Sequence, residues 1–269
     1  MSLLHALVLG AVQGLTEFIP ISSSGHLVLV PAALGWDQPS LAFDVMLHTA
    51  SLLALAVYFR RELVELAVGV ARGEPGMRRL LLLLVVGTIP AVVAGAALGE
   101  YFEGTFTDAP SAAIQLVVTA AILVAAEVAL SFHAARTARR EQQLRTIDAL
   151  GPGDAAAIGV AQAISILPGI SRSGATIAAG LALSMRRDDA ARFSFLLAMP
   201  ALLGASLVEI PELAGAPLAL GPALGGFVTS LVTSYLAIAG LIRYLKTNTL
   251  YPFALYCLVA GIAFYLAVD

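Results

Sequence analysis

Two short stretches of this chain combine hydroxyl, carboxylate, imidazole and guanidinium groups in a pattern that suits phosphate chemistry. The first contains Glu17 and the run 22–26, Ser-Ser-Ser-Gly-His; the second is the run 168–176, in which Arg172 lies between two serines. A guanidinium fork, hydroxyl donors and the backbone N–H groups at a helix N-terminus together suit a phosphate group. Each stretch therefore predicts an anion site at the start of a helix.

Arg172 is the first candidate for a functional side chain. Every other Lys and Arg lies at the end of an apolar segment or in a connection, whereas Arg172 lies in a break within an apolar region. An ionisable residue at membrane depth is costly and is by default a functional residue. Ser171, Ser173 and the helix expected to begin near Gly174 surround it with donors for phosphate. A purely structural ion pair with Glu17 is the alternative.

The first stretch adds a histidine and a carboxylate. His26 follows Ser23 by three residues, so the two side chains share a helical face if the helix begins near Ser22. His26 could orient a hydroxyl or donate to a leaving oxygen; a bond to a backbone carbonyl is the alternative. Glu17 follows Gln13 by four residues on one helical face. Glu17 suits a general base, a metal ligand or the counter-ion of Arg172.

Four further ionisable residues lie in apolar segments. We expect supporting roles at the site for Asp44 and His48. We expect structural or interfacial roles for His5 and Glu127. The chain has no His-rich metal motif, Walker loop or dinucleotide fingerprint, and its single Cys257 excludes an internal disulfide framework and a thiolate metal cluster.

The composition is that of an integral membrane protein. Of 269 residues, 59% are apolar and 12% are charged, against about 25% charged in a soluble domain. A net charge of -3 indicates no nucleic acid or other polyanionic partner. Six segments are long enough to cross a hydrocarbon core of about 30 Å. They are Phe43–Phe59, Leu80–Leu98, Ala112–Phe132, Ala190–Ile210, Ala219–Leu241 and Tyr251–Val268.

Four shorter apolar segments form two pairs, each broken by proline, glycine and serines. They are Leu3–Glu17 with Ser24–Leu34, and Ala155–Ile166 with Gly174–Met185. Polar backbone at membrane depth persists only where it is buried in protein or lines a cavity. Each pair therefore predicts a re-entrant helix hairpin, with a spanning helix kinked by proline as the alternative.

The two broken pairs are related by an internal duplication with an offset of 149 residues. Gln13 matches Gln162, and Ser22, Ser24 and Gly25 match Ser171, Ser173 and Gly174. Lys and Arg occupy alternate connections between the apolar segments, for example 60–79 and 136–145, whereas Gly99–Ser111 and Pro211–Leu218 have none. The connections that carry Lys and Arg are therefore expected in the cytoplasm. Three spans separate the pairs, which makes the repeat inverted: 1–150 and 151–269 form one membrane domain of the kind seen in secondary transporters.

The two stretches also carry a family resemblance. The run 13–26, Gln-Gly-Leu-Thr-Glu-Phe-Ile-Pro-Ile-Ser-Ser-Ser-Gly-His, and the run 168–176, Pro-Gly-Ile-Ser-Arg-Ser-Gly-Ala-Thr, resemble the two signatures of the undecaprenyl-pyrophosphate phosphatase family, also called bacitracin-resistance proteins. Their order, their spacing and the chain length fit that family, so the resemblance covers essentially the whole chain.

The resemblance implies hydrolysis of undecaprenyl pyrophosphate to the monophosphate carrier and phosphate. The reaction would occur at the outer face of a bacterial plasma (inner) membrane, recycle the carrier for cell-wall synthesis and confer bacitracin resistance. Position by position, the resemblance implies catalytic roles for Glu17, Ser23, His26 and Arg172. It also implies a divalent cation, Mg²⁺ or Ca²⁺, with Glu17 as a ligand, although Gln13 replaces the glutamate of many members and weakens a two-carboxylate site.

Residues and resemblance together predict one anion held between two helix N-termini and opening outward. Ser23 is the expected nucleophile with Glu17 as its base and His26 as the acid or orienting group; direct attack by water is the alternative. The expected substrate-binding residues are Gln13, Ser22, Ser24, Gly25, Gly169, Ser171, Ser173, Gly174 and Thr176.

A second class of function stays open from the sequence. An inverted repeat with broken helices would equally suit a transporter or flippase for the polyprenyl phosphate. Transport needs binding but no base or nucleophile, so the set Glu17, Ser23, His26 and Arg172 favours the phosphatase. The expected partners are the polyprenyl pyrophosphate substrate and membrane lipids, with a homodimer as one possible assembly.

Overall fold

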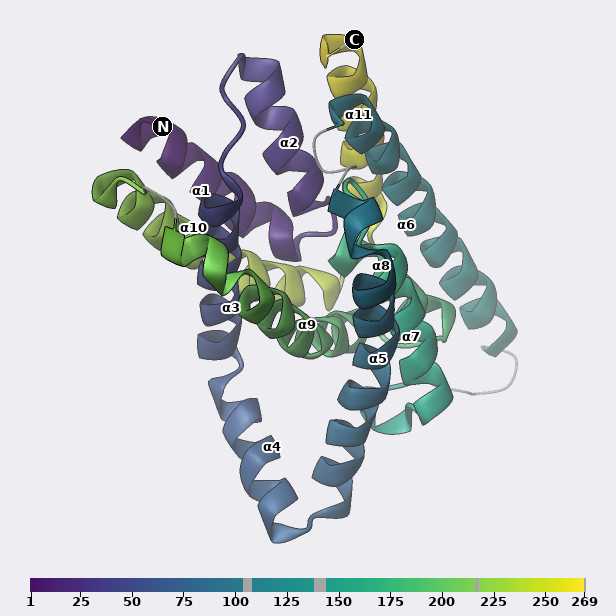
Figure 1. Cartoon of the computed structure of the whole chain (residues 1–269). Helices are drawn as coiled ribbons and strands as arrows, with labels where there is room; N and C mark the ends of the chain where they lie inside the picture. The colour runs from purple at the N-terminus through teal and green to yellow at the C-terminus, as the bar shows by residue number, and fades with distance from the viewer. Residues whose placement is uncertain (104–107, 138–143, 216–217, 269) are drawn as a thin grey trace.

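In the part of the chain that the structure describes, the regular elements are helices (Figure 1). The computed structural model describes residues 1–103, 108–137, 144–215 and 218–268, and only the backbone of 98–103, 134–137, 209–215 and 268. The predicted connections therefore lie partly outside the described residues, at 104–107, 216–217 and, with Arg139 and Arg140, at 138–143. The described helices are α1 Leu3–Phe18, α2 Ser23–Leu34, α3 Leu41–Tyr58, α4 Arg60–Arg72, α5 Pro75–Glu103, α6 Ala109–Thr137, the short η1 Ile147–Ala149, α7 Pro152–Ile164, α8 Arg172–Ala182, α9 Arg187–Gly215, α10 Leu220–Leu245 and α11 Tyr251–Val268.

Five helices are long and apolar enough to cross a membrane, and they confirm five of the six predicted spans. They are α3, α5, α6, α9 and α10, and the protein is a polytopic membrane protein. The sixth predicted span corresponds to α11, whose apolar stretch Tyr251–Ala267 is shorter. The two broken pairs are present as α1 with α2 and α7 with α8, and the helices of each pair pack against each other.

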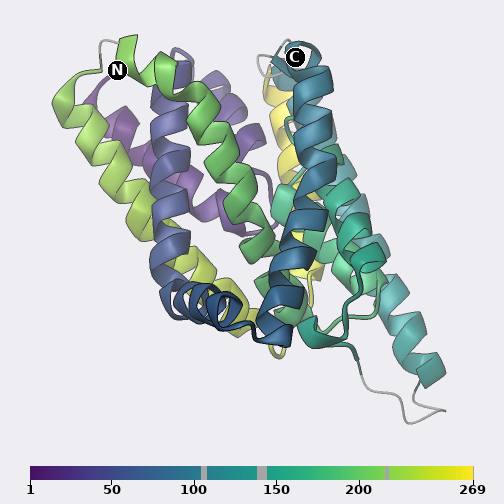
Figure 2. The ribbon, with the colours of Figure 1, turned by 60° about the horizontal axis from the view of Figure 1, so that its bottom comes forward.

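One helix was not predicted from the sequence. Residues 60–72, expected as part of a polar connection, form α4. The helix ends at Gly73, whose φ of 80° lies in the left-handed region that glycine adopts freely. Figure 2 shows α4 at the end of α3, where the chain turns toward α5. The helix has only 13 residues and mixes charged with apolar ones, so it escapes a search for long apolar segments.

Two close helix crossings repeat the internal duplication. Gly10 of α1 lies against Gly226 of α10, and a Cβ on Gly10 would be 2.4 Å from the Gly226 carbonyl oxygen. Gly159 of α7 lies in the same way against Gly87 of α5, where a Cβ would be 2.2 Å from the Gly87 carbonyl oxygen. Gly10 and Gly159 are 149 residues apart. Small residues let helix backbones approach closely in membrane proteins, so glycine is required at both crossings.

Gly159→Ala should therefore destabilise the protein. The added methyl group overlaps backbone rather than a flexible side chain, and overpacking of this kind costs about 1–3 kcal/mol. Gly153→Ala is the matched control, because a Cβ at that position of the same helix meets open space. Thermal unfolding in detergent should show a lower midpoint for Gly159→Ala alone. Equal midpoints would contradict the close crossing.

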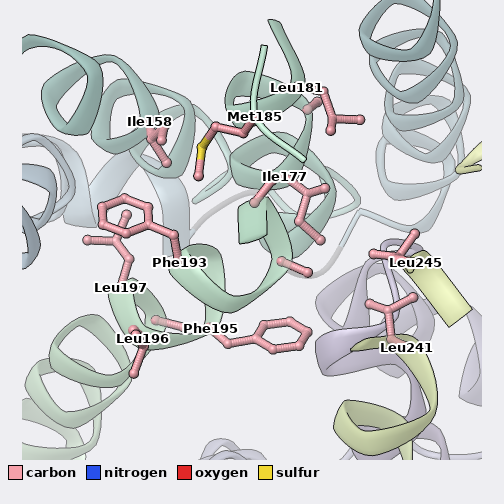
Figure 3. Close-up of a cluster of buried hydrophobic side chains, with 14 of the residues drawn as sticks. Ile158, Ile177, Leu181, Met185, Phe193, Phe195, Leu196, Leu197, Leu241 and Leu245 are labelled. Carbon is pink, nitrogen blue, oxygen red and sulfur yellow. The ribbon is translucent and has the colours of Figure 1, made fainter. Parts of the chain in front are cut away.

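A buried apolar cluster, part of which Figure 3 shows, includes Phe18 at the end of α1 that carries Glu17. Phe18, the residue after Glu17, packs edge-on against Phe195 of α9 with ring centroids 5.3 Å apart, and Phe59 lies 6.5 Å from the same ring. Aromatic pairs of this geometry stabilise beyond their buried area. The cluster thereby fixes the last turn of α1.

Glu127 and His5 have the structural roles expected from the sequence. Arg187 Nε and Nη2 donate to the buried Glu127 carboxylate at 2.9 and 2.5 Å, and the Leu250 N–H donates to it at 2.7 Å. The pair ties α6 to α9 and to the start of α11. His5 stacks on Trp36 with ring centroids 3.9 Å apart.

Candidate active site

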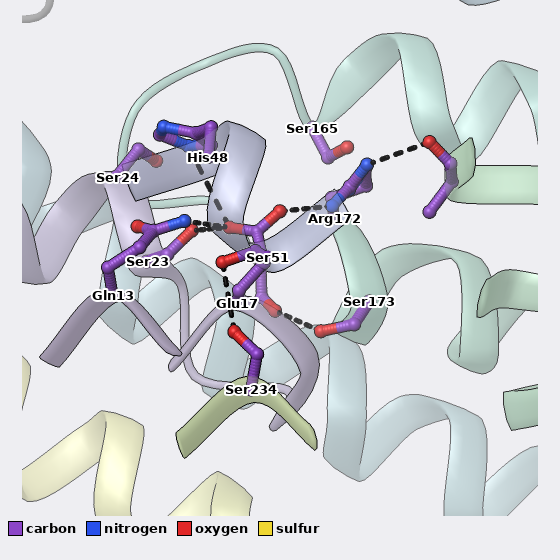
Figure 4. Close-up of polar contacts among 12 residues, drawn as sticks. Gln13, Glu17, Ser23, Ser24, His48, Ser51, Ser165, Arg172, Ser173 and Ser234 are labelled. Carbon is purple, nitrogen blue, oxygen red and sulfur yellow. Dashed lines mark hydrogen bonds and ion pairs between the residues drawn. The ribbon is translucent and has the colours of Figure 1, made fainter. Parts of the chain in front are cut away.

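Glu17 is the centre of the polar cluster between the two broken helix pairs (Figure 4). Its side chain is buried in the last turn of α1. Oε2 accepts hydrogen bonds from Gln13 Nε2 at 3.0 Å and from the Ser23 hydroxyl, and Oε1 pairs with Arg172 Nη2. A single carboxylate therefore joins α1, α2 and α8.

Arg172 reaches this carboxylate from the first residue of α8. Its Nη2 pairs with Glu17, and its Nη1 donates to the Ala198 carbonyl of α9 at 3.5 Å. A guanidinium has more N–H donors than these two contacts use. The ion pair considered for Glu17 and Arg172 is present, and it holds Arg172 beside the Ser23 hydroxyl.

The two breaks lie side by side, as the sequence predicted. The Ser173 hydroxyl donates to the Ile19 carbonyl at 3.3 Å, and the Gly169 N–H donates to Ser24 Oγ at 3.5 Å. A Cβ on Gly25 would lie 3.1 Å from the Gly169 Cα, so the turns touch through two glycines. Gly169 also has a φ of 92°, which favours glycine.

Serine caps begin both helices that leave the breaks. Ser22 Oγ accepts from the Gly25 N–H at 3.3 Å, and Ser171 Oγ accepts from the Gly174 N–H at 3.0 Å. These caps satisfy backbone N–H groups that a helix leaves unpaired at its start. Thr176 lies deeper, where its hydroxyl contacts the Arg172 carbonyl at 2.7 Å and Ser194 Oγ at 2.5 Å. These hydroxyls shape the site, and Ser23 is the one that contacts Glu17.

The two candidate histidines occupy different places. His26 Nδ1 lies 2.7 Å from the Ser22 carbonyl oxygen and its Nε2 lies 2.7 Å from the Tyr256 hydroxyl. His48 of α3 is the imidazole next to the carboxylate, with Nε2 3.8 Å from Glu17 Oε2. Its Nδ1 lies 2.9 Å from the Asp44 carbonyl oxygen. The supporting position expected for His48 is the one observed, whereas the sequence carried no sign of Tyr256.

The second half of the duplication lacks the carboxylate. Ile166 stands where the offset of 149 places the partner of Glu17, and Arg172 stands where it places the partner of Ser23. Gln162, the partner of Gln13, is buried, and neither of its side-chain polar atoms has a hydrogen-bond partner among the described residues. The duplication therefore yields one asymmetric site rather than two.

The fold and the site define a polytopic membrane protein with one buried carboxylate, hydroxyl and guanidinium centre where two broken helix pairs meet. Within this class the particular family is clear, since the model of the family described as bacitracin resistance protein BacA matches residues 6–263. The chain belongs to this family.

Curated relatives extend over nearly the whole chain. A protein of Geobacter sulfurreducens named undecaprenyl-diphosphatase is 42% identical, with 97% of this chain and 96% of the relative covered. Proteins of the same name from Gloeobacter violaceus and Idiomarina loihiensis are 42% and 38% identical, covering 94% and 99% of this chain and 87% and 99% of their own lengths.

Proposed function

We propose that this protein hydrolyses undecaprenyl pyrophosphate to undecaprenyl phosphate and inorganic phosphate, and so recycles the lipid carrier for cell-wall synthesis and confers bacitracin resistance. The observation that carries the proposal is the contact of the Ser23 hydroxyl with the buried Glu17 carboxylate beside Arg172. A nucleophile within hydrogen-bond reach of a base is the signature of covalent catalysis. The family and the names of the relatives support the same reaction.

The first chemical step transfers the terminal phosphoryl group to Ser23. Ser23 Oγ forms a bond to the terminal phosphorus, the bond from that phosphorus to the bridging oxygen breaks, and undecaprenyl phosphate leaves with the electron pair. The hydroxyl proton passes to Glu17. Arg172 and the N–H groups that begin α2 and α8 stabilise the charge on the equatorial oxygens.

The second step hydrolyses the phosphoserine. Once Glu17 has released its proton to solvent, it takes a proton from the water that attacks the phosphorus. The bond from phosphorus to Ser23 Oγ breaks, Ser23 takes up a proton, and phosphate leaves. In the alternative mechanism Glu17 activates water directly and Ser23 only orients it. His26 acts in both as the group that orients the serine turn.

The residues at Glu17 fit a hard divalent cation held together with substrate. Mg²⁺ is usually bound by one or two carboxylates plus substrate phosphates. Gln13 lies on the same helical face as Glu17, and its buried Oε1 has no hydrogen-bond partner among the described residues. Glu17 and Gln13 Oε1 would supply oxygen ligands, and the cation, Mg²⁺ or Ca²⁺, would neutralise phosphate charge.

The proposed topology is an inverted repeat of six spans, α11 included, and two re-entrant pairs in a bacterial plasma membrane. The packing between the two halves supports this topology. The helix α1 of the first half packs on α10 of the second, and α7 of the second half packs on α5 of the first. The two glycine crossings are related in the same way. Both termini lie at one end of the molecule (Figures 1 and 2), as six spans require, and we place this end and the opening of the site outside.

Single-cysteine labelling tests this topology in a Cys257→Ala background. We expect Asp37→Cys to react with an impermeant maleimide from outside intact cells and Glu74→Cys to react only after the membrane is opened. Both positions are exposed in the structure, and the basic residues around Glu74 belong in the cytoplasm. The reverse pattern would overturn the proposed orientation.

Phosphate release from undecaprenyl pyrophosphate by the purified protein in detergent tests the function. Hydrolysis that depends on Glu17 supports the phosphatase. Binding of undecaprenyl phosphate with no release of phosphate from the pyrophosphate would instead support the transporter. The mass of the protein in detergent tests for a homodimer.

A further inference from the structure

The C-terminal helix α11 packs against the first break and the helix α2 that follows it. Tyr256 and His26 are 230 residues apart, yet the Tyr256 hydroxyl lies 2.7 Å from His26 Nε2 and the rings stack at an interplanar angle of 14°. Phe264 packs edge-on against the same imidazole. Cys257, which follows Tyr256 in the chain, has its Sγ 3.7 Å from the Pro20 carbonyl oxygen. This helix therefore contacts both the turn and the helix that follows it.

The hydrogen-bond chemistry gives the contact a direction. The Ser22 carbonyl oxygen can only accept, so the His26 Nδ1 that lies 2.7 Å from it carries the proton. In the neutral imidazole the other nitrogen, Nε2, then accepts, and the Tyr256 hydroxyl donates to it. The Ser22 carbonyl thus selects the tautomer, and the Tyr256 hydroxyl, by donating to Nε2, holds the imidazole in the orientation in which Nδ1 binds this carbonyl.

The turn held in this way is strained. Ser22 has a φ of 70°, a region that residues other than glycine rarely adopt. Such a conformation persists only when the surrounding structure determines it. Ser22 is followed directly by Ser23, so the rotation of its carbonyl decides where the Ser23 hydroxyl lies relative to Glu17.

The second break supplies an internal comparison. The capping serine there, Ser171, has a φ of -70°, an ordinary extended conformation. The residue that the offset of 149 matches to His26 is Ala175, which cannot make this bond. The histidine is therefore present in the half whose capping serine has a positive φ and absent from the other half.

We infer that Tyr256 is a positioning residue for the proposed reaction: through His26 it holds the Ser22 carbonyl and so presents the Ser23 hydroxyl to Glu17. The inference rests on the proposed function for its kinetic consequence. Its structural part, the Tyr256 contact with His26, stands on the geometry alone.

Tyr256→Phe tests the inference, because it removes the hydroxyl and keeps the ring. We expect kcat for phosphate release to fall about tenfold, as for loss of one hydrogen bond, with KM within about twofold of the parent because the effect is confined to the transition state. Tyr265→Phe, a change at another partly exposed tyrosine of α11, is the matched control and should keep parent values.

A spectroscopic measurement separates positioning from a general loss of structure. In protein labelled with ¹⁵N-histidine, the His26 Nε2 resonance, assigned with His26→Asn, should shift in Tyr256→Phe and not in Tyr265→Phe, with an unchanged unfolding midpoint. Parent kcat together with an unshifted resonance would overturn the inference, as would a lower unfolding midpoint with normal kcat of the folded fraction. If the parent releases no phosphate, the proposed function fails, and the resonance still decides whether Tyr256 holds His26.

Discussion

Ser23→Ala should abolish turnover, whereas Ser24→Ala should stay within about tenfold of the parent. Ser23 donates directly to Glu17, and Ser24 only accepts from the Gly169 N–H at 3.5 Å and contacts Ser22 at 3.4 Å. Loss of one neutral hydrogen bond costs about 0.5–1.5 kcal/mol, or roughly tenfold in rate. Loss of a nucleophile removes the reaction path, so the two outcomes differ clearly in size.

Phosphate release under saturating substrate measures both variants, and rapid quench with substrate labelled on the terminal phosphate looks for a phosphoserine directly. Glu17→Gln should resemble Ser23→Ala, because the amide keeps the shape but cannot take the proton. It also leaves Arg172 without its buried counter-ion. If Ser23→Ala kept activity within tenfold of the parent while Glu17→Gln was inactive, the serine nucleophile would be excluded. Glu17 would then activate water or bind a metal.

Arg172→Lys should lower kcat/KM roughly thirtyfold or more, although the charge is retained. This corresponds to a loss of about 2 kcal/mol or more in transition-state stabilisation. Arg172 spans two acceptors on different helices, Glu17 of α1 and the Ala198 carbonyl of α9. A lysine ammonium is a single point donor on a flexible stem and cannot hold both acceptors while it faces a phosphate.

Arg192→Lys is the control for this change. Arg192 pairs with Glu62 at 3.1 Å, and both side chains are partly exposed, where an ion pair contributes little. Its kcat/KM should remain near the parent value. Near-parent turnover of Arg172→Lys would show that charge alone suffices and would remove the forked contact from the proposed mechanism.

The sequence by itself predicted most of the helices and supplied the candidates for the reacting groups. Long apolar segments predicted five helices that the structure contains, because the length of a spanning helix is a local property of the chain. The breaks were also local, since proline, glycine and capping serines act on their own turn. The helix α4 was missed because an amphipathic helix of 13 residues is neither long nor uniformly apolar.

Only the tertiary structure decided how these groups are used. Sequence spacing put His26 on one face with Ser23, yet its imidazole lies between the Ser22 carbonyl and Tyr256, while His48 approaches Glu17 from α3. The convergence of Glu17 and Arg172, 155 residues apart, follows from the packing of the two broken pairs. Direction and partner choice of a buried polar side chain depend on which helices pack around it, and no local pattern contains that information.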